Sequence, residues 1–267
     1  MSKEQKYLYD REAKSGRVTL VGAGPGAVDL LTLRGQRALA AAEVVVYDDL
    51  ANPALLDFAP ETARRIYVGK RAGQHSHQQE RITAILIEEA RSGAHVVRLK
   101  GGDPLVFGRG GEEMQALAAE EIPYDVVPGV TAAIAAGAGT GIPLTHRDHA
   151  SAVIFVTGHE CAGKAAERPG VDWAALARTG ATLCIYMGVR RLPEIAAALR
   201  EGGLGGATPV AVVANASLPT QSVHLTTLQA APAFSAVLQG QPSLIIVGEV
   251  VRWAELQNTM QSLQLAG

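Results

Sequence analysis

A short β-branched run that opens into a glycine turn constrains the fold more than any other feature of this sequence. Residues 18–21 read Val-Thr-Leu-Val and lead into the turn Gly22-Ala23-Gly24-Pro25-Gly26-Ala27, which is typical of a strand that ends in a tight connection. Apolar residues then recur near helical spacing over residues 30–42, with Asp29 placed to cap the helix, and residues 43–47 read as a second strand. This order predicts a βαβ unit and an α/β fold.

The same alternation of strands and helices continues to the end of the chain. Ser76 is placed to cap a long helix that ends at Gly93. Further strands are expected at residues 65–68, 96–99, 124–127, 152–157, 182–187, 210–214, 223–227 and 244–247, and further helices at 54–58, 112–120, 173–177, 192–200 and 253–263. The strands around Val223 and Leu244 allow antiparallel pairing, because the chain between them has room for only a short helix.

Pro128-Gly129 breaks the chain near its middle, and the following residues 130–141 are small and nearly uncharged. Such a segment suits close packing at a domain junction. We therefore expect a mobile N-terminal arm over residues 1–16, an N-terminal α/β domain over residues 17–129 and a C-terminal α/β domain over residues 130–267.

The first glycine turn allows a second interpretation. Gly22, Gly24 and Ala27 satisfy the pattern G-x-G-x-x-G/A, and Asp48 follows the second strand near the spacing of a ribose-binding acid. Pro25 weakens this interpretation, because it has no N–H to give a pyrophosphate. An NAD(P)-dependent oxidoreductase nevertheless stays an alternative.

The stretch VRLKGGDPLVFGRGGEE, residues 97–113, points most directly to a ligand. Two adjacent glycines, Gly101 and Gly102, follow a strand and allow a small molecule to lie against bare backbone. Arg109 has glycines on both sides, and its planar guanidinium suits a carboxylate. We expect a ligand-facing Arg109, with bracing of the loop through Glu112 or Glu113 as the alternative.

Composition excludes several classes of function. The formal net charge of −2 argues against broad electrostatic binding of nucleic acid. The two cysteines, Cys161 and Cys184, lie far apart and indicate neither a disulfide framework nor a zinc site, and no metal is expected. The polar start has no secretory pattern and no apolar run reaches the length of a membrane helix, so we expect a cytoplasmic protein without membrane contact.

Several separated motifs carry a family resemblance over nearly the whole chain. They are VGAGPG, VYDDL, VGKR, GGDPLVFGRGGEE, VVPGVTAA, GIPLTHRDHA, VTGH and YMG. Together they resemble the uroporphyrinogen-III C-methyltransferases of the tetrapyrrole methylase superfamily. The resemblance implies a class III methyltransferase with two α/β domains and a cofactor cleft between them. It also implies conversion of uroporphyrinogen III to precorrin-2 with S-adenosylmethionine, S-adenosylhomocysteine as the second product, and a homodimer.

The resemblance assigns roles to particular residues by position. Its S-adenosylmethionine contacts fall on Pro25, Gly101, Gly102, Asp103, Val106, Thr131, Ala132, Met187 and Ala216. Its proton acceptor falls on Asp48 and its proton donor on Lys70, with Arg109 beside the substrate and Glu112 as a second candidate acceptor. Basic loop residues that could hold the acceptor's carboxylates are Lys70, Arg71, Arg109, Arg147, His146, His149 and His159.

Some roles stay open at this point. Asp103 could contact the donor or only cap the loop after Gly102, and Asp48 or Glu112 could orient a pyrrole N–H rather than take a proton. The same basic residues would also serve a non-catalytic tetrapyrrole carrier. The product would enter sirohaem, cobalamin or haem d1 synthesis, and the sequence does not choose among these.

Overall fold

The computed structural model describes residues 16–69, 75–159 and 170–254, except the side chains of residues 75–78, and these residues form two compact units. The units span Met1–Thr131 and Ala132–Gly267. The expected arm at residues 1–16 lies outside the description except for Gly16, and so does most of the helix expected at residues 253–263. Within the described residues, no helix has the length and apolar character that crossing a membrane requires.

The first unit is built on a sheet of five parallel strands in the order β3-β2-β4-β1-β5. The strands are β1 (Arg17–Gly22), β2 (Val44–Tyr47), β3 (Arg64–Tyr67), β4 (His95–Lys100) and β5 (Tyr124–Val127). The three central strands are almost completely buried, as their β-branched composition requires. The expected α/β fold is confirmed.

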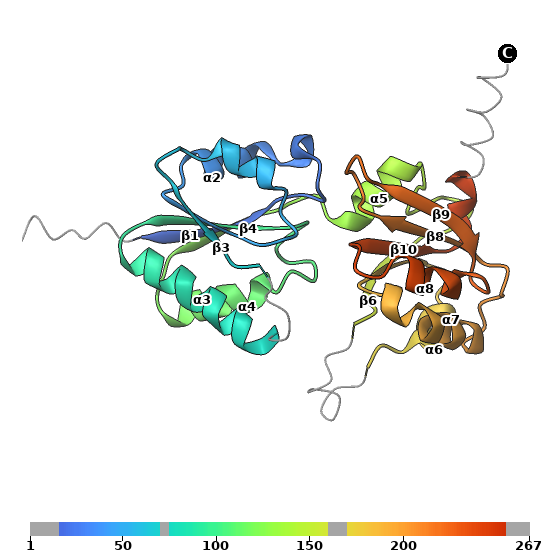
Figure 1. Ribbon diagram of the computed structural model, residues 1–267. Coiled ribbons are helices and arrows are strands. Elements are labelled where there is room, and N and C mark those ends of the chain that lie inside the picture. Colours follow the sequence, from blue (N-terminus) through green and yellow to red (C-terminus); the bar gives the residue numbers. More distant parts are fainter. Residues whose placement is uncertain (1–15, 70–74, 160–169, 255–267) are drawn as a thin grey trace, which may run out of the picture. The chain divides into compact units, whose positions relative to one another are not determined.

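Helices cover both faces of this sheet (Figure 1). One face carries α2 (Leu33–Ala40) with the 3₁₀ helices η1 (Val28–Leu30) and η2 (Pro53–Phe58), and the other carries α3 (His75–Arg91) and α4 (Gly110–Ala119). The two buried clusters are centred on Leu39, Leu55 and Leu99 on the α2 side and on Leu20, Leu86 and Leu117 on the α3 side.

Two expected helix caps were wrong. Asp29 lies inside η1, and the chain becomes extended again at Leu31, so α2 begins only at Leu33. The cap is Thr32, whose hydroxyl accepts the Gly35 N–H at 3.1 Å. Likewise α3 already includes Ser76, because its first residue is His75.

The second unit contains a mixed sheet in the order β6-β7-β10-β8-β9. Its strands are β6 (Val153–Thr157), β7 (Thr182–Tyr186), β8 (Pro209–Ala214), β9 (Ser222–Thr227) and β10 (Ser243–Val247). Only β6 and β7 pair in parallel, and every other pair is antiparallel. The expected pairing of β9 with β10 was wrong, because all six residues of β8 are buried and this strand takes a partner on each edge.

Helices of the second unit cover one face of this sheet (Figure 1). They are α6 (Trp173–Ala177), α7 (Leu192–Glu201) and α8 (Phe234–Val237), with the 3₁₀ helices η3 (Val189–Arg191) and η4 (Ala231–Ala233) beside them, and η5 (Glu249–Val251) follows β10. Ile185, Ile195, Leu199 and Val212 are central to the core beneath them. The small-residue segment expected at a junction forms a helix, α5 (Ala132–Thr140).

Candidate active site

The carboxyl ends of the five parallel strands bring the loops that follow them to one edge of the first unit's sheet. Strands β1 and β4 are neighbours there, and the chain leaves them toward opposite faces, with α2 after β1 and α4 after β4 (Figure 1). Such a switch point opens a crevice in which α/β proteins bind ligands. The edge therefore collects the two glycine-rich loops that the sequence singled out.

The two glycine loops are bonded to each other through their backbones. Gly24 N–H donates to Gly102 O at 3.2 Å, and Gly102 N–H donates to Gly24 O at 2.7 Å. Both residues have positive φ, +76° and +67°, which favours glycine. A Cβ at Gly101 would lie 2.5 Å from Leu50 Cβ, whereas one at Gly102 would meet only Thr131 Cα, at 3.9 Å. Gly102 thus faces open space while Gly101 is packed against protein.

Asp103 fastens this pair of loops to the loop after β5. Its Oδ1 accepts the Leu105 N–H at 2.8 Å, and its Oδ2 accepts the Gly129 N–H at 3.0 Å. Gly129 packs so closely on Gly102 that a Cβ would lie 2.2 Å from the Gly102 oxygen. The capping role considered from the sequence is therefore present, and it fixes the shape of the edge around Gly102.

A network of four charged side chains, three of them buried, lies beside this edge, and sequence reasoning missed it. Arg98 and Lys100 are on β4, Asp48 follows β2, and Glu113 is on α4. Arg98 Nη2 donates to Asp48 Oδ2 at 2.6 Å. Glu113 Oε1 accepts from Lys100 Nζ at 3.0 Å, Gln79 Nε2 at 3.1 Å and Arg98 Nε at 3.4 Å. The signal was present in the sequence, since Arg98 and Lys100 are two residues apart and point to the same face of the sheet.

Burial makes this network electrostatically sensitive. The side chains of Arg98 and Glu113 are 2% and 0% exposed. Burial and the neighbouring Arg98 charge lower the pKa of Lys100, and Glu113 opposes that shift. Glu113 Oε2 has no hydrogen-bond partner within the described residues, so the single atom Oε1 holds this side of the network together.

Arg109 adopts the left-handed conformation, with φ +57°, immediately before α4. Its Nε and Nη2 donate to the two carboxylate oxygens of Glu112 at 2.9 and 2.7 Å. The two side chains are 46% and 56% exposed. The bracing contact considered as an alternative is thus formed, at the surface beside the glycine loop. Val106, also expected near the donor, lies in this loop and is half-buried.

In the second unit, the predicted residues Met187, Ala216 and His159 follow β7, β8 and β6. These three strands run in the same direction, so the residues share one edge of the sheet. Met187, Asn215 and Ser217 all have positive φ, between 52° and 68°, a strained state that is frequent at ligand sites.

Ala132 is the first residue of α5, and Thr131 directly precedes it. The Tyr186 hydroxyl accepts the Ala133 N–H at 3.1 Å, which joins the start of α5 to the last residue of β7. Thr131 is buried and Arg147 is exposed. The rings of His146 and His149 lie 4.8 Å apart in the same loop as Arg147. Lys70 and Arg71 lie outside the described residues.

Comparison with known proteins places this geometry in a family. The model of the Tetrapyrrole (Corrin/Porphyrin) Methylases matches residues 17–232. The chain belongs to this family. The uroporphyrin-III C-methyltransferase of Thermus thermophilus is 40% identical, with a TM-score of 0.75 over 89% of this chain and 94% of that one. A second crystal structure of that enzyme, with the same identity, coverage and TM-score, is a complex with S-adenosylhomocysteine.

Longer relatives match as well. The sirohaem synthase of Zymomonas mobilis is 50% identical over 237 residues, or 89% of this chain and 49% of the relative. Sirohaem synthase 1 of Serratia proteamaculans is 49% identical over 250 residues, or 92% of this chain and 51% of the relative. The chain thus spans about half the length of these curated relatives.

The tetrapyrrole methylase fold also explains why the dinucleotide pattern misleads. In a dinucleotide-binding sheet β1 adjoins β2, so that the acid after β2 lies beside the glycine turn. Here β4 lies between them, and Asp48 bonds Arg98 of that intervening strand. The Gly24 N–H, which a pyrophosphate would need, donates to Gly102. The first sheet therefore does not have the arrangement that NAD(P) binding requires.

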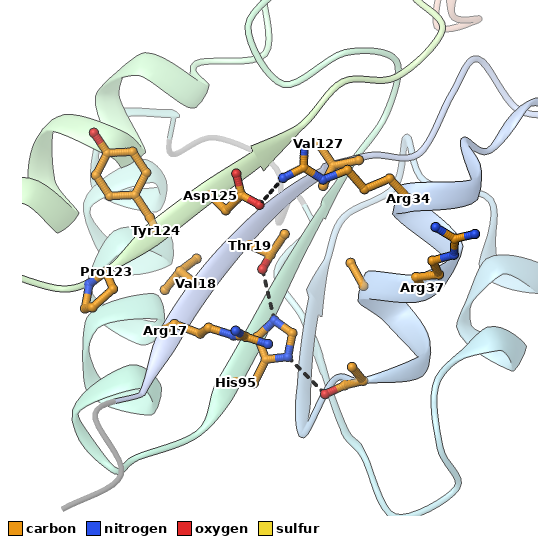
Figure 2. A pocket seen from close by; sticks show the side chains of 12 residues that line it. Arg17, Val18, Thr19, Arg34, Arg37, His95, Pro123, Tyr124, Asp125 and Val127 are labelled. Atoms are coloured by element: carbon orange, nitrogen blue, oxygen red, sulfur yellow. Dashed lines mark hydrogen bonds and ion pairs between the residues drawn. The ribbon is translucent and has the colours of Figure 1, made fainter.

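A cavity of about 310 Å³ lies at the opposite, amino-terminal edge of the first sheet (Figure 2). Arg17, His95 and Tyr124 line it from the first residues of β1, β4 and β5. None of the residues assigned to the donor or the acceptor lines this cavity. The His95 ring bonds the Thr19 hydroxyl at 2.9 Å and the Ala41 carbonyl at 2.9 Å. Figure 2 shows the ring beside Thr19, with Arg17 next to it.

His95 makes stability depend on pH. Burial, and secondarily the Arg17 charge, lower the pKa of His95 against the opposing effect of the Ala41 bond. The unfolded chain therefore binds the proton more readily, so the His95 contribution is complete above the ordinary pKa of about 6.5 and is lost as the pH falls below it. We expect the free-energy difference between wild type and His95→Gln, from urea unfolding, to shrink from pH 7.5 to 5.5. A constant difference would contradict this prediction.

Proposed function

We propose that this protein transfers methyl groups from S-adenosylmethionine to two pyrrole rings of uroporphyrinogen III and forms precorrin-2. One observation carries the proposal: the glycine loops after β1 and β4 are bonded backbone to backbone at the switch point, with Gly102 open to a ligand. The 40% identity to the Thermus thermophilus methyltransferase, over 94% of that chain, supports it.

The proposed donor site is made largely of backbone and small side chains. In the first unit it uses Pro25, Gly101, Gly102, Asp103, Val106 and Thr131, and in the second Ala132, Met187 and Ala216. A sulfonium cation loses charge as the methyl group leaves, so apolar surroundings such as Val106 and Met187 disfavour the bound donor more than the transition state. Asp103 acts by keeping the loop around Gly102 in shape.

The proposed acceptor site uses the chain's basic loop residues. Lys70, Arg71, Arg109, Arg147 and His159, with Glu112 orienting Arg109, hold the carboxylates of the macrocycle. A pyrrole carbon gives its π pair to the methyl carbon while the carbon–sulfur pair stays on sulfur, which leaves S-adenosylhomocysteine. The positive charge that passes to the macrocycle is discharged by loss of one proton, and Asp48 is the proposed acceptor. Lys70 is the proposed donor for tautomerisation of the methylated macrocycle, in which the proton it gives to one position is balanced by a proton that leaves another position and returns to Lys70 through water.

The same proposal covers the pathway that takes the product, the location of the protein in the cell and its oligomeric state. Precorrin-2 is the shared precursor expected for sirohaem, cobalamin and haem d1, and the sirohaem synthases among the relatives favour the first of these routes. We further propose a cytoplasmic homodimer. Light scattering of the purified protein tests the dimer, and a monomer at assay concentration would contradict it.

The decisive experiment supplies both substrates without oxygen. Incubation with uroporphyrinogen III and methyl-labelled S-adenosylmethionine should release two equivalents of S-adenosylhomocysteine for each macrocycle, with two labelled methyl groups in the product by mass spectrometry. Calorimetry should show S-adenosylhomocysteine binding and none of NADH. Tight NADH binding alone would favour an oxidoreductase, and binding of the macrocycle without methylation would favour a carrier.

Arg109→Lys tests whether this side chain grips a substrate carboxylate. Lysine keeps the charge but not the paired geometry that Arg109 shows toward Glu112, so we expect the methylation rate to fall at least about tenfold. An exposed ion pair adds only about 0.2–1 kcal/mol to stability, so the melting temperature should hardly change. Arg252→Lys is the matched control, because Arg252 pairs with Glu249 at the same spacing and similar exposure. Unchanged turnover by Arg109→Lys at saturating substrates would refute the binding of a substrate carboxylate by Arg109.

A further inference from the structure

Two of the three guanidinium nitrogens of Arg98, Nη1 and Nε, are bonded to groups of the sheet and of α4. Its Nη1 donates to the Leu99 carbonyl at 2.9 Å and to the Val46 carbonyl at 3.5 Å, and its Nε points to Glu113. Val46 is the register partner of Arg98 across β2 and β4. A planar group held at Nη1 and Nε has no freedom to rotate, so the direction of its remaining nitrogen, Nη2, is set by the sheet.

Nη2 is the nitrogen that meets Asp48. The carboxylate Oδ2 accepts from it at 2.6 Å, and Oδ1 accepts the Leu50 N–H at 3.1 Å. An ionised carboxylate has about four acceptor positions, so these bonds leave acceptor capacity on both oxygens. The Asp48 side chain is 25% exposed, whereas that of Arg98 is 2% exposed. Asp48 thus stands between a rigid buried cation and the open carboxyl edge.

We propose that Arg98 is a positioning residue that orients the Asp48 carboxylate for the acceptor macrocycle, with Glu113 holding Arg98 in turn. The proposal rests on the proposed function, since the methylation reaction reports the orientation. A charge-assisted bond from a side chain that is itself fixed limits the rotation of the acceptor. Precise placement of a reacting group matters because misplacement by about 1 Å can cost 10²-fold in rate.

Arg98 must then act through Asp48 and not independently of it. Lysine at position 98 keeps a cation but loses the fork that spans Asp48, Glu113 and the two carbonyls. In the wild-type background we expect Arg98→Lys to lower kcat at least about tenfold, with a smaller change in the acceptor KM and S-adenosylhomocysteine affinity within about twofold. In an Asp48→Asn background the same change should have almost no further effect on kcat.

This double-mutant cycle separates positioning from structure. If Arg98 only supports the fold, Arg98→Lys lowers kcat by the same factor in both backgrounds, and the proposal is overturned. Arg64→Lys is the control, because Arg64 also extends from a strand of this sheet and pairs with Glu89 at 3.0 Å, away from Asp48. It should leave kcat unchanged in both backgrounds. An inactive wild type would instead refute the proposed function and leave the cycle without a signal.

A measurement on Arg98 itself covers the case in which Arg98→Lys fails to fold. At low temperature the Nη protons of a guanidinium held by carboxylates exchange slowly, so the wild-type NMR spectrum should show resolved Arg98 Nη2 signals. Asp48→Ala removes a partly exposed side chain, and the Nη2 signals should then broaden while those of Nη1 persist. Identical spectra for wild type and Asp48→Ala would show that Arg98 does not hold Asp48 and would overturn the proposal.

Discussion

Glu113→Gln is expected to lower the free energy of unfolding by about 3–5 kcal/mol, the range for removing one partner of a buried ion pair. Glutamine preserves the shape but takes away the negative charge that Oε1 presents to Arg98 and Lys100. Two buried cations would then share the partly exposed Asp48. Urea unfolding of wild type and variant at pH 7 measures the loss.

The adjacent residue provides a matched control. Glu112 also carries an ion pair on the first turn of α4, but it is exposed, so Glu112→Gln should cost less than about 1 kcal/mol. The double variant Glu113→Gln/Lys100→Met should lose less than the sum of its single variants, because it removes the unpaired cation as well. Equal losses for Glu112→Gln and Glu113→Gln would contradict the buried network.

The loss of stability caused by Glu113→Gln should also depend on pH. Lys100 already has a lowered pKa, and Glu113 opposes that lowering, so its removal lowers the pKa of Lys100 further. The unfolded chain then binds the proton more readily than the folded variant does, and stability rises with pH while the lysine loses its proton. The difference between Glu113→Gln and wild type should therefore shrink as the pH is raised from 7 toward 10.

Local sequence patterns predicted the elements better than their arrangement. The β-branched runs at residues 18–21 and 43–47 and the glycine turn between them suffice for a βαβ unit, because strand propensity and turn chemistry act within a few residues. Strand order depends on packing between distant segments. The insertion of β4 between β1 and β2 had no local signal, and neither had the position of β8 between β9 and β10.

In the candidate site too, features set by neighbouring residues were predicted and features set by distant residues were not. The glycines at 101 and 102 indicated backbone exposed to a ligand, because their meaning is local. Arg98 and Lys100 were not recognised as buried, since their partners Asp48 and Glu113 come from other elements and a charge is buried only when such a partner is supplied. The pair between Arg109 and Glu112 spans three residues and could be foreseen.

Asp48→Asn is expected to lower the methylation rate by about 10²- to 10⁴-fold, the range for loss of a positioned general base. Asparagine has nearly the same size and keeps one oxygen for the Leu50 N–H, but it takes no proton from the methylated macrocycle and offers Arg98 no charge. Within the part of the chain that the structure describes, the backbone bonds that join the glycine loops at Gly24 and Gly102 do not involve Asp48, so S-adenosylhomocysteine affinity should change less than about threefold.

The neighbouring Asp49 separates this role from a general need for negative charge at the end of β2. Asp49 accepts a hydrogen bond from the Tyr67 hydroxyl and is exposed, whereas the carboxylates that Arg98 bonds among the described residues are those of Asp48 and Glu113. Asp49→Asn should keep the rate within about twofold of wild type, because a solvated carboxylate contributes little to the orientation of its neighbour. Single-turnover measurements with saturating donor compare the chemical step in the two variants. Similar rates for Asp48→Asn and Asp49→Asn would mean that the proton leaves through another group, and would remove Asp48 from the proposed mechanism.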